Sequence, residues 1–340
     1  MSVRVAINGL GRIGRAILKL VLDYPAFQLV AANDVVDADN LAYLLRFDTV
    51  YGRYPKPVAA TGADLVIDGV RVRTFTEPDP AKLPWRDLGV ELVFECTGKF
   101  TRRQDLEKHV RAGARTVLLS APSNGGDVET VVHGTNVARA SSSIISCASC
   151  TTNCIAPIVE IVGRRLGFKK AAMTTVHAYT GSQSIVDGPS KRLRRGRAAA
   201  ANLVPTTTGA ATATIRALPQ YAGLIDGMAL RIPIPAGSIA DLTFVTARET
   251  TVEEVNRIFT DEAGSERYAG VLGVSNDPLV SSDIVGDPRA SIVDLGLTRV
   301  IDGDLLKIMS WYDNEWGYAN QMVREALAAT SGDATSEDRA

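Results

Sequence analysis

The beginning of the chain alternates apolar runs of strand length with apolar residues at helical spacing. Val3 to Ile7 is a short run of β-forming residues, which predicts a strand. Beyond a glycine-rich stretch, apolar residues recur along one helix face, namely Ile13, Ile17, Leu20 and Val21. Phe27 to Ala32 predicts the next strand. This order of strand, glycine turn, helix and strand is typical of a parallel α/β sheet.

The rest of the first half continues this pattern. Val90 to Phe94 and Thr116 to Leu119 predict buried strands, and Ile144 to Ser146 predicts the last strand of this half. Before them, Leu65 to Phe75 carries Asp68-Gly69 between two β-rich arms, which predicts an inserted hairpin. We therefore expect a first domain built on a doubly wound parallel sheet.

The second half has a different pattern. Apolar residues at helical spacing after Ser149 predict a helix that Gly167 caps; they are Ile155, Ile158, Val159, Val162 and Leu166. Further on, Val252 to Ala263 predicts another helix. Ile292 to Ile301 and Leu305 to Tyr312 flank Asp302-Gly303, which predicts a hairpin. We expect an α+β domain with a mainly antiparallel sheet faced by helices.

Length and composition bound the class of protein. A chain of 340 residues is long for one hydrophobic core, so two domains are expected. We place a dinucleotide-binding domain at 1–149, with a C-terminal helix at 315–329 packing back on it, a catalytic domain at 150–314, and a loose tail at 330–340. The net charge of −1 gives no support for nucleic acid or membrane as a partner. With no long apolar segment and a strand directly at the N-terminus, we expect a cytoplasmic protein.

The glycine turn predicts a dinucleotide site. In Gly9-Leu10-Gly11-Arg12-Ile13-Gly14, glycines permit close approach of the backbone to a pyrophosphate, and the helix N-terminus offers N–H donors. Asp34 follows the second strand at the spacing expected for a carboxylate on the ribose hydroxyls. Such a turn or carboxylate alone is weak evidence, but together they favour a Rossmann-type domain that binds NAD rather than NADP. Thr97 and Ser120, at strand ends, are candidate groove residues, although small polar residues there are usually turn formers.

Cys150 is the candidate nucleophile. It lies in Ser149-Cys150-Thr151-Thr152-Asn153-Cys154, at the start of a predicted helix, where the helix dipole stabilises a thiolate. A buried structural cysteine is the ordinary alternative, but the hydroxyl-rich setting argues against it. Cys147, Cys150 and Cys154 lack a fourth ligand, so we expect no metal. A Cys147–Cys150 disulfide under oxidation is a secondary possibility.

The choice of a base is narrow because the chain has three histidines. His109 lies in a charged helix predicted over Arg102 to Arg111, so we expect it on a solvated face. His177 lies in Met173 to Tyr179, a predicted strand that leads into a polar segment. A histidine within hydrogen-bonding reach is the usual activator of a cysteine. We therefore pair His177 with Cys150.

Basic and hydroxyl residues follow His177. The basic residues of this segment are Lys191, Arg192, Arg194, Arg195 and Arg197; such a run is usually a solvated face, but beside a nucleophile it suits an anionic substrate. Thr206-Thr207-Thr208-Gly209 and Arg231 are further candidate phosphate ligands. A covalent thiol and a bound hydride carrier together indicate oxidation of an aldehyde through a thioester.

Taken together, these residues resemble the phosphorylating glyceraldehyde-3-phosphate dehydrogenases from Val3 to about Ala328. The most specific segments are Ala6 to Arg15, Ala148 to Cys154, Thr174 to Tyr179, Pro205 to Ala211 and Trp311 to Tyr318. The resemblance implies Cys150 as nucleophile and His177 as base. Beside the glycine turn at Gly9, Gly11 and Gly14, it implies NAD contacts at Arg12, Ile13, Asp34, Thr97, Ser120 and Asn314, with Asn314 on the nicotinamide carboxamide and Tyr318 nearby. It implies that Ser149, Thr151, Thr180, Arg195, Thr208, Gly209 and Arg231 hold the substrate phosphate and the attacking inorganic phosphate.

The resemblance also implies the reaction and the assembly. The substrates are D-glyceraldehyde 3-phosphate, inorganic phosphate and NAD, the product is 1,3-bisphosphoglycerate, and the enzyme is a homotetramer. The chain departs from the family pattern at Cys147, where Asn is usual, at Gly181-Ser182, where Asn-Asp is common, and at Pro78, where a basic residue is frequent. Gly188 stands where some strictly NAD-dependent members carry Leu, which opens room for NADP.

Two other functions stay open at this point. An erythrose-4-phosphate dehydrogenase uses the same Cys/His pair with water as the acyl acceptor; Tyr179-Thr180 and Thr206 to Gly209 favour the phosphorylating reaction. A non-catalytic NAD-binding regulatory protein is the alternative from another class. The presence of both Cys150 and His177 argues against it.

Overall fold

The computed structural model describes residues 2–139 and 142–330. Its contacts divide the chain into two compact units. Unit 1 comprises the chain up to His133, Val137–Ala148 and the chain from Met322, and unit 2 comprises Gly134–Asn136 and Ser149–Gln321. The tail expected at 330–340 lies outside the described residues except for Thr330, which ends the last helix.

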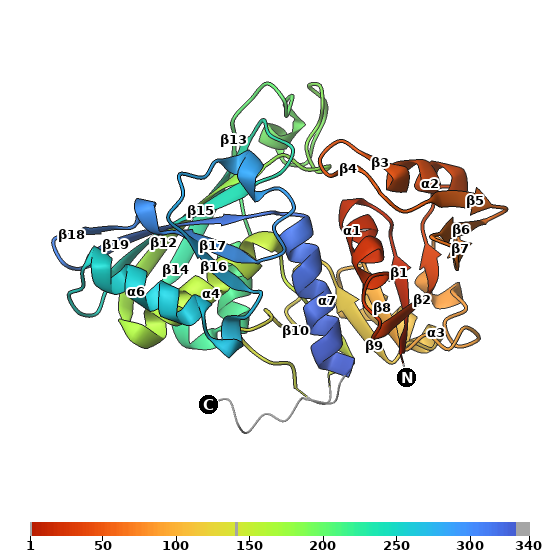
Figure 1. Ribbon diagram of the computed structural model, residues 1–340, viewed down its shortest axis with the longest axis horizontal. Coiled ribbons are helices and arrows are strands. Elements are labelled where there is room, and N and C mark those ends of the chain that lie inside the picture. Colours follow the sequence, from red (N-terminus) through yellow and green to blue (C-terminus); the bar gives the residue numbers. More distant parts are fainter. Residues whose placement is uncertain (1, 140–141, 331–340) are drawn as a thin grey trace. The chain divides into compact units, whose positions relative to one another are not determined.

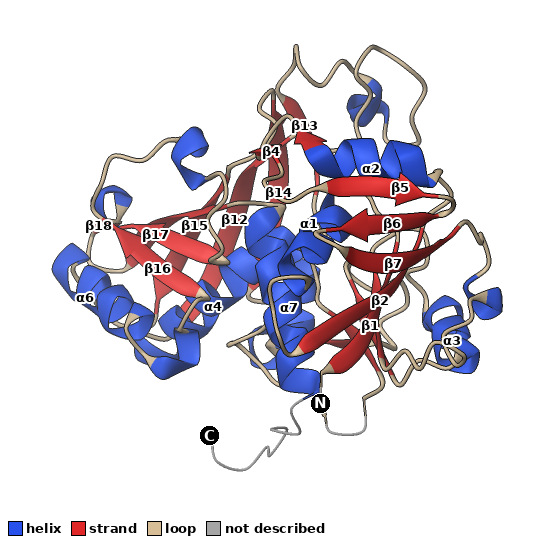
Figure 2. Ribbon diagram, turned by 45° about the vertical axis from the view of Figure 1, so that its right-hand side comes forward, coloured by secondary structure: helices blue, strands red, loops and turns tan. Residues whose placement is uncertain are grey.

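Unit 1 is built on a nine-stranded sheet in the order β10-β11-β9-β8-β1-β2-β7-β6-β5. The strands are β1 Val3–Asn8, β2 Phe27–Asn33, β5 Val58–Thr61, β6 Asp64–Ile67, β7 Val70–Phe75, β8 Leu92–Glu95, β9 Thr116–Leu119, β10 Glu129–Thr130 and β11 Ile144–Ser146. Pairing is parallel from β10 through β7 and antiparallel from β7 to β5. The predicted parallel sheet and the hairpin at Asp68-Gly69 are confirmed. Figure 2 shows β1, β2, β7, β6 and β5 in this succession.

Unit 1 also contains the short pair β3 (Phe47–Asp48) and β4 (Gly52–Arg53), the end of the last helix from Met322, and, among its described residues, three complete helices. They are α1 Arg12–Val21, α2 Ala38–Arg46 and α3 Arg103–Ala112. The Asp37 carboxylate starts α2 by accepting from Asn40 N at 2.9 Å, which satisfies a donor that the helix leaves unpaired. Gly113 ends α3 at a φ of 124°, where a side chain is strained. The core beside α3 includes Trp85, Val93 and Leu106, all fully buried.

His109 corrects one expectation from the sequence. It lies in α3, as predicted, but its side chain is fully buried rather than on a solvated face. Its ring stacks near Trp85, with centroids 6.3 Å apart, and Nε2 lies 3.0 Å from Glu95 Oε2. The charged neighbours in sequence concealed a helix face that turns inward, because helix positions three or four apart share a face.

Unit 2 is built on an eight-stranded sheet in the order β13-β14-β12-β15-β19-β17-β16, with β18 also paired to β19. The strands are β12 Phe168–Ala178, β13 Val204–Thr207, β14 Ile225–Ile232, β15 Ser238–Thr246, β16 Leu272–Ser275, β17 Ser291–Asp294, β18 Arg299–Ile301 and β19 Leu305–Tyr312. Only β12·β14 and β16·β17 pair in parallel, so the mainly antiparallel sheet is confirmed. Ile292 to Ile301 is not one strand, because Leu295–Leu297 form a 3₁₀ turn that separates β17 from β18.

The helices of unit 2 are α4 Cys150–Arg165, α5 Ala210–Ala217 and α6 Val252–Ala263, and α7 Trp316–Thr330 begins in this unit. In Figure 1, α4 and α6 lie against one face of the sheet. Short 3₁₀ turns occur at Pro80–Lys82, Leu193–Gly196, Pro219–Tyr221, Glu266–Tyr268 and Ser281–Ile284. Throughout the described residues, no helix has the length and apolar character needed to cross a membrane.

Candidate active site

Cys150 is the first residue of α4. Ser149 precedes the helix in an extended conformation, and its hydroxyl accepts from Thr152 N at 3.1 Å. This cap stabilises the helix start. Just upstream, Ala148 has a φ of 56°, a conformation that residues with a side chain rarely adopt and that is found at functional sites. The chain thus presents the thiol at a helix N-terminus, as the sequence predicts.

His177, near the end of β12, meets the thiol. Its Nε2 lies 3.3 Å from Cys150 Sγ, and its Nδ1 lies 2.6 Å from the carbonyl oxygen of Ala178. The carbonyl can only accept, so we place the ring proton on Nδ1; Arg231 Nη1, which also lies 3.0 Å from Nδ1, then donates to the same carbonyl and not to the ring. Nε2 then carries a lone pair toward the thiol, and His177 is oriented to take its proton.

Burial governs the electrostatics of this pair. It raises the pKa of the Cys150 thiol, and the positive charge of Arg231 opposes that rise. Burial, and after it the positive charge of Arg231, lower the pKa of His177 to about 3. His177 is therefore the neutral imidazole over the physiological range, which is the form that accepts a proton.

Two arginines lie in a polar cluster beside His177. We call it the arginine cluster and define it as Thr180, Ser182, Arg195 and Arg231. Arg231 Nη1 lies 3.0 Å from His177 Nδ1 and donates to Ala178 O at 3.1 Å and Thr180 Oγ1 at 3.4 Å. Thr180 Oγ1 lies 2.9 Å from Ser182 Oγ, which accepts from Arg195 Nη1 at 3.2 Å. Hydrogen bonds thus join the two guanidinium groups into one array.

The arginine cluster has the electrostatics of an anion site. Burial lowers the pKa of Arg195 to about 10 and also lowers the pKa of Arg231. Arg231 Nε is buried and has no hydrogen-bond partner within the described part of the chain. Two neighbouring positive charges with a donor left over favour a multiply charged oxyanion.

The other predicted phosphate ligands have local partners. Thr151 Oγ1 bonds Tyr312 Oη at 2.8 Å, and Ser149 caps α4 as described. Thr208 Oγ1 accepts from Ala210 N at 3.1 Å, and Gly209 is the N-cap of α5. These residues lie in unit 2 with the arginine cluster, and their neighbours Thr206 and Thr207 accept from Arg195 at 3.0 and 3.3 Å. Their role at phosphate stays a prediction.

Two residues of this site were given no role from the sequence, although Ser182 was noted there as a departure from the family pattern. Ser182 bridges the two arginines. Tyr312 places its hydroxyl between Thr151 and Thr175, at 2.8 and 2.7 Å, and its ring edge-on to His177. Both depend on pairings between segments far apart in the chain. Only the resemblance to a family pointed to the segments that contain them.

The glycine turn of unit 1 has the shape that a dinucleotide needs. A Cβ on Gly9 would lie 2.7 Å from Thr97 N, and one on Gly14 would lie 1.9 Å from Gly9 O. At Gly11, by contrast, a Cβ would meet no described atom within 4 Å beyond its neighbours. The turn is therefore closed against the sheet and open at the start of α1, where the helix dipole and N–H groups suit a diphosphate.

The predicted NAD residues around this turn are engaged as follows. The Asp34 carboxylate accepts from Leu10 N at 2.6 Å and Val36 N at 3.0 Å. It therefore holds the turn, whatever else it binds. Arg12 pairs with Asp48 at 2.5 Å. Thr97 donates to Glu95 from both N and Oγ1, and Ser120 contacts the Cys96 thiol.

Asn314 and Tyr318 lie in unit 2 and are buried. Asn314 Oδ1 accepts from Ser238 Oγ at 2.9 Å, which fixes the orientation of the amide. Their contact with nicotinamide stays a prediction.

Neither a metal centre nor a disulfide occurs among the described residues. No group of three or more His, Cys, Asp or Glu side chains there is arranged to hold a metal ion. All four cysteines are free thiols.

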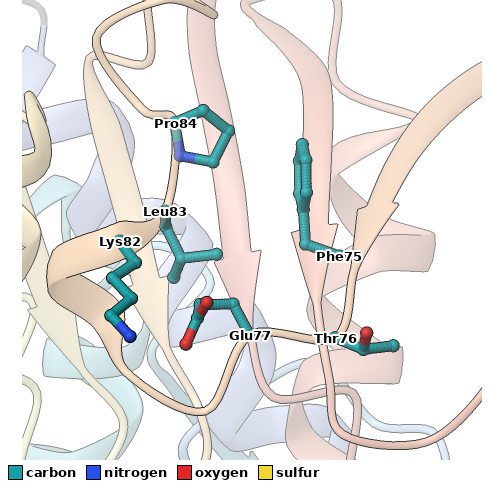
Figure 3. A pocket seen from close by; sticks show the side chains of 6 residues that line it. All are labelled: Phe75, Thr76, Glu77, Lys82, Leu83 and Pro84. Atoms are coloured by element: carbon teal, nitrogen blue, oxygen red, sulfur yellow. The ribbon is translucent and has the colours of Figure 1, made fainter.

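A pocket of about 320 Å³ opens in unit 1, where the chain leaves β7. Figure 3 shows its lining, Phe75, Thr76, Glu77, Lys82, Leu83 and Pro84, with the charged Glu77 and Lys82 on the side away from Pro84. It contains neither the cysteine nor the histidine of the candidate active site. We assign the chemistry to the Cys150 and His177 pair instead.

Comparisons with known proteins agree over nearly the whole chain. The family model for the glyceraldehyde 3-phosphate dehydrogenase NAD binding domain matches residues 3–103, and the model for the C-terminal domain matches residues 149–314. Glyceraldehyde-3-phosphate dehydrogenase 2 of Streptomyces avermitilis is 47% identical over 327 residues, covering 95% of this chain and 97% of the relative. Glyceraldehyde-3-phosphate dehydrogenase of Thermotoga maritima is 49% identical, covering 94% and 97%. Glyceraldehyde-3-phosphate dehydrogenase 1 of Bacillus subtilis is 45% identical, covering 95% and 97%.

Proposed function

Because this chain belongs to the glyceraldehyde 3-phosphate dehydrogenase family, we propose that it converts D-glyceraldehyde 3-phosphate, NAD and inorganic phosphate to 1,3-bisphosphoglycerate, reversibly. The observation that carries this proposal is the 3.3 Å contact between Cys150 Sγ and His177 Nε2 beside the arginine cluster. A thiol paired with a base forms thioesters. Paired guanidinium groups bind phosphate.

In the first step of the proposed reaction, the Cys150 sulfur attacks the aldehyde carbon while its proton passes to His177 Nε2 and on to the new hydroxyl. His177 then removes the hydroxyl proton from this hemithioacetal as hydride leaves the same carbon. NAD, when bound, is the hydride acceptor. Inorganic phosphate attacks the resulting thioester and releases the acyl phosphate, and the Cys150 thiolate recovers the proton from His177.

Initial rates with and without inorganic phosphate test this function. With glyceraldehyde 3-phosphate and NAD, we expect turnover that depends on phosphate, because phosphate is the acyl acceptor. Phosphate-independent turnover that is faster on erythrose 4-phosphate would instead assign the hydrolytic reaction. Binding of NAD without any turnover on either aldehyde, or any acyl-enzyme on Cys150, would leave only a binding function.

We also propose the division of labour between the units. Unit 1 supplies the dinucleotide turn at Gly9, Gly11 and Gly14, and unit 2 supplies the catalytic cysteine and histidine. From the family resemblance we further propose a cytoplasmic homotetramer. Light scattering tests the assembly, with four times the monomer mass expected; a monomer would contradict it.

Asp34 should set the preference between NAD and NADP. Replacing it by Ala should weaken NAD binding about tenfold, because a charge-assisted hydrogen bond is lost. Asp34→Asn keeps an oxygen to accept from Leu10 N but removes the charge that repels a 2′-phosphate. We therefore expect Asn, more than Ala, to improve NADP binding, as measured by titration of both cofactors. Equal NAD affinity in wild type and both variants would limit Asp34 to the turn.

A further inference from the structure

A buried polar network occupies one edge of the unit 1 sheet, and the proposed reaction leaves it without a role. Asn8 ends β1, Asn33 ends β2 and Glu95 ends β8. These three strands are adjacent and parallel. Their last residues are at most 4% exposed. Carboxyl ends of neighbouring parallel strands form the ligand-binding edge of such a sheet.

Hydrogen bonds connect the three strand ends directly. Asn8 Nδ2 donates to Glu95 Oε2 at 2.5 Å, and Asn8 Oδ1 accepts from Asn33 Nδ2 at 2.7 Å. Asn33 Oδ1 also accepts from Glu77 N at 2.9 Å, which ties in the chain after β7. Each side chain therefore fixes its neighbour as well as its own strand.

His109 closes the network from α3. Trp85 Nε1 can only donate, and it lies 3.0 Å from His109 Nδ1, so Nδ1 accepts. The ring proton is then on Nε2, which donates to Glu95 Oε2 at 3.0 Å. Glu95 Oε1 accepts from Thr97 N at 2.8 Å and from Thr97 Oγ1. Glu95 thus accepts from four donors, which is what a fully buried carboxylate requires.

The network ends where the dinucleotide residues begin. Gly9 follows Asn8, Asp34 follows Asn33, and Thr97 is itself bonded to Glu95. Gly9 lies so close to Thr97 that a Cβ would be 2.7 Å from Thr97 N, so a shift at Glu95 reaches the glycine turn. A buried ionic group is costly compared with apolar packing. Because Glu95 lies at the ligand-binding edge of the sheet, we infer that it serves ligand binding as well as the stability of the core.

We propose that Glu95 and His109 are positioning residues for the dinucleotide. They hold Thr97, the glycine turn and the strand end before Asp34 in the arrangement that binds the adenosine diphosphate half of the cofactor. This inference rests on the proposed function only for the identity of the ligand. Among the described residues, the hydrogen bonds of Cys150 and His177 do not involve the network, so its loss should change cofactor affinity and leave kcat at saturation intact.

The test measures binding of NAD and of ADP-ribose, which lacks the nicotinamide, by calorimetry. In Glu95→Gln the amide NH₂ faces at least one of the four donors, so we expect both ligands to bind about ten- to a hundredfold more weakly. His109→Phe removes the Nε2 donor and leaves Trp85 Nε1 unpaired, and about a tenfold loss is expected. His109→Gln can restore a donor to Glu95 and should recover most of this loss. The kcat of each variant at saturating NAD should stay within about threefold of the wild-type kcat. That ratio corresponds to a difference of less than about 1 kcal/mol in activation free energy.

Glu160→Gln is the matched control. Glu160 is a buried carboxylate of unit 2 that bonds Arg164 and Tyr268, so it carries the same change of charge away from the strand ends. We expect it to lower the melting temperature and leave ADP-ribose affinity unchanged. An equal loss of ADP-ribose affinity in Glu160→Gln would overturn the positioning role. Unchanged affinity in His109→Phe would overturn it too, and this variant provides the test if Glu95→Gln does not fold. Failure of the wild type to bind ADP-ribose would instead contradict the proposed dinucleotide site.

Discussion

Replacing Cys150 by Ser should abolish oxidation of glyceraldehyde 3-phosphate, with a loss of about 10⁴-fold or more in kcat, as for other enzymes that lose their nucleophile. A serine hydroxyl is a far weaker acid than a thiol, and a neutral His177 cannot ionise it in the buried site. Burial already raises the pKa of the thiol itself. NAD affinity should change little, because the glycine turn belongs to unit 1. Steady-state rates and calorimetry measure the two quantities.

The other cysteines provide the controls for this experiment. Cys154 is fully buried in α4 with its sulfur 3.9 Å from Ser291 Oγ, and Cys147 is buried in unit 1. Cys154→Ser and Cys147→Ser should therefore keep most of the activity. If Cys147→Ser were as inactive as Cys150→Ser, and the protein held stoichiometric metal, the assignment of the nucleophile would have to be abandoned.

The fold could be predicted where one local pattern decides the outcome. The strands that the sequence indicated in unit 1 are all present, because buried parallel strands are apolar throughout. His109 was misplaced because the helix around it is charged in sequence, while its own contacts, Glu95 and Trp85, lie in other segments. Helix α5 was not predicted, because its sequence of Ala and Thr carries little apolar periodicity.

The candidate site divides in the same way. Cys150 and His177 were predictable because their residue types have few uses in such settings and the chain offers few alternatives. The residues that orient this cysteine and histidine could not be predicted from the sequence. Ser182 and Tyr312 act through hydroxyl groups, and hydroxyl residues are too common in sequences for any one to be singled out. Pairing across 161 residues, as between Thr151 and Tyr312, is visible only in the folded chain.

Arg231→Ala should lower kcat/KM for glyceraldehyde 3-phosphate by about a hundredfold or more, since two charge-assisted hydrogen bonds to phosphate contribute at least about 3 kcal/mol. Unphosphorylated glyceraldehyde should lose much less, because it has no phosphate to bind. Arg195→Ala should show the same preference for loss on the phosphorylated substrate. The two arginines differ in their neighbours: Arg231 Nη1 lies 3.0 Å from His177 Nδ1, whereas Arg195 bonds Thr206, Ser182 and Thr207.

The pH dependence separates the two arginines. The charge of Arg231 acts to lower the pKa of both Cys150 and His177, so its removal should raise both pKa values. The rate of Cys150 alkylation by iodoacetamide should therefore rise at a higher pH in Arg231→Ala than in wild type. Arg195 is no cause of the Cys150 shift, although it also lowers the pKa of His177, so Arg195→Ala should displace this profile less. Equal losses on the two aldehydes with an unshifted profile would show that Arg231 supports the fold, and its assignment to phosphate would be withdrawn.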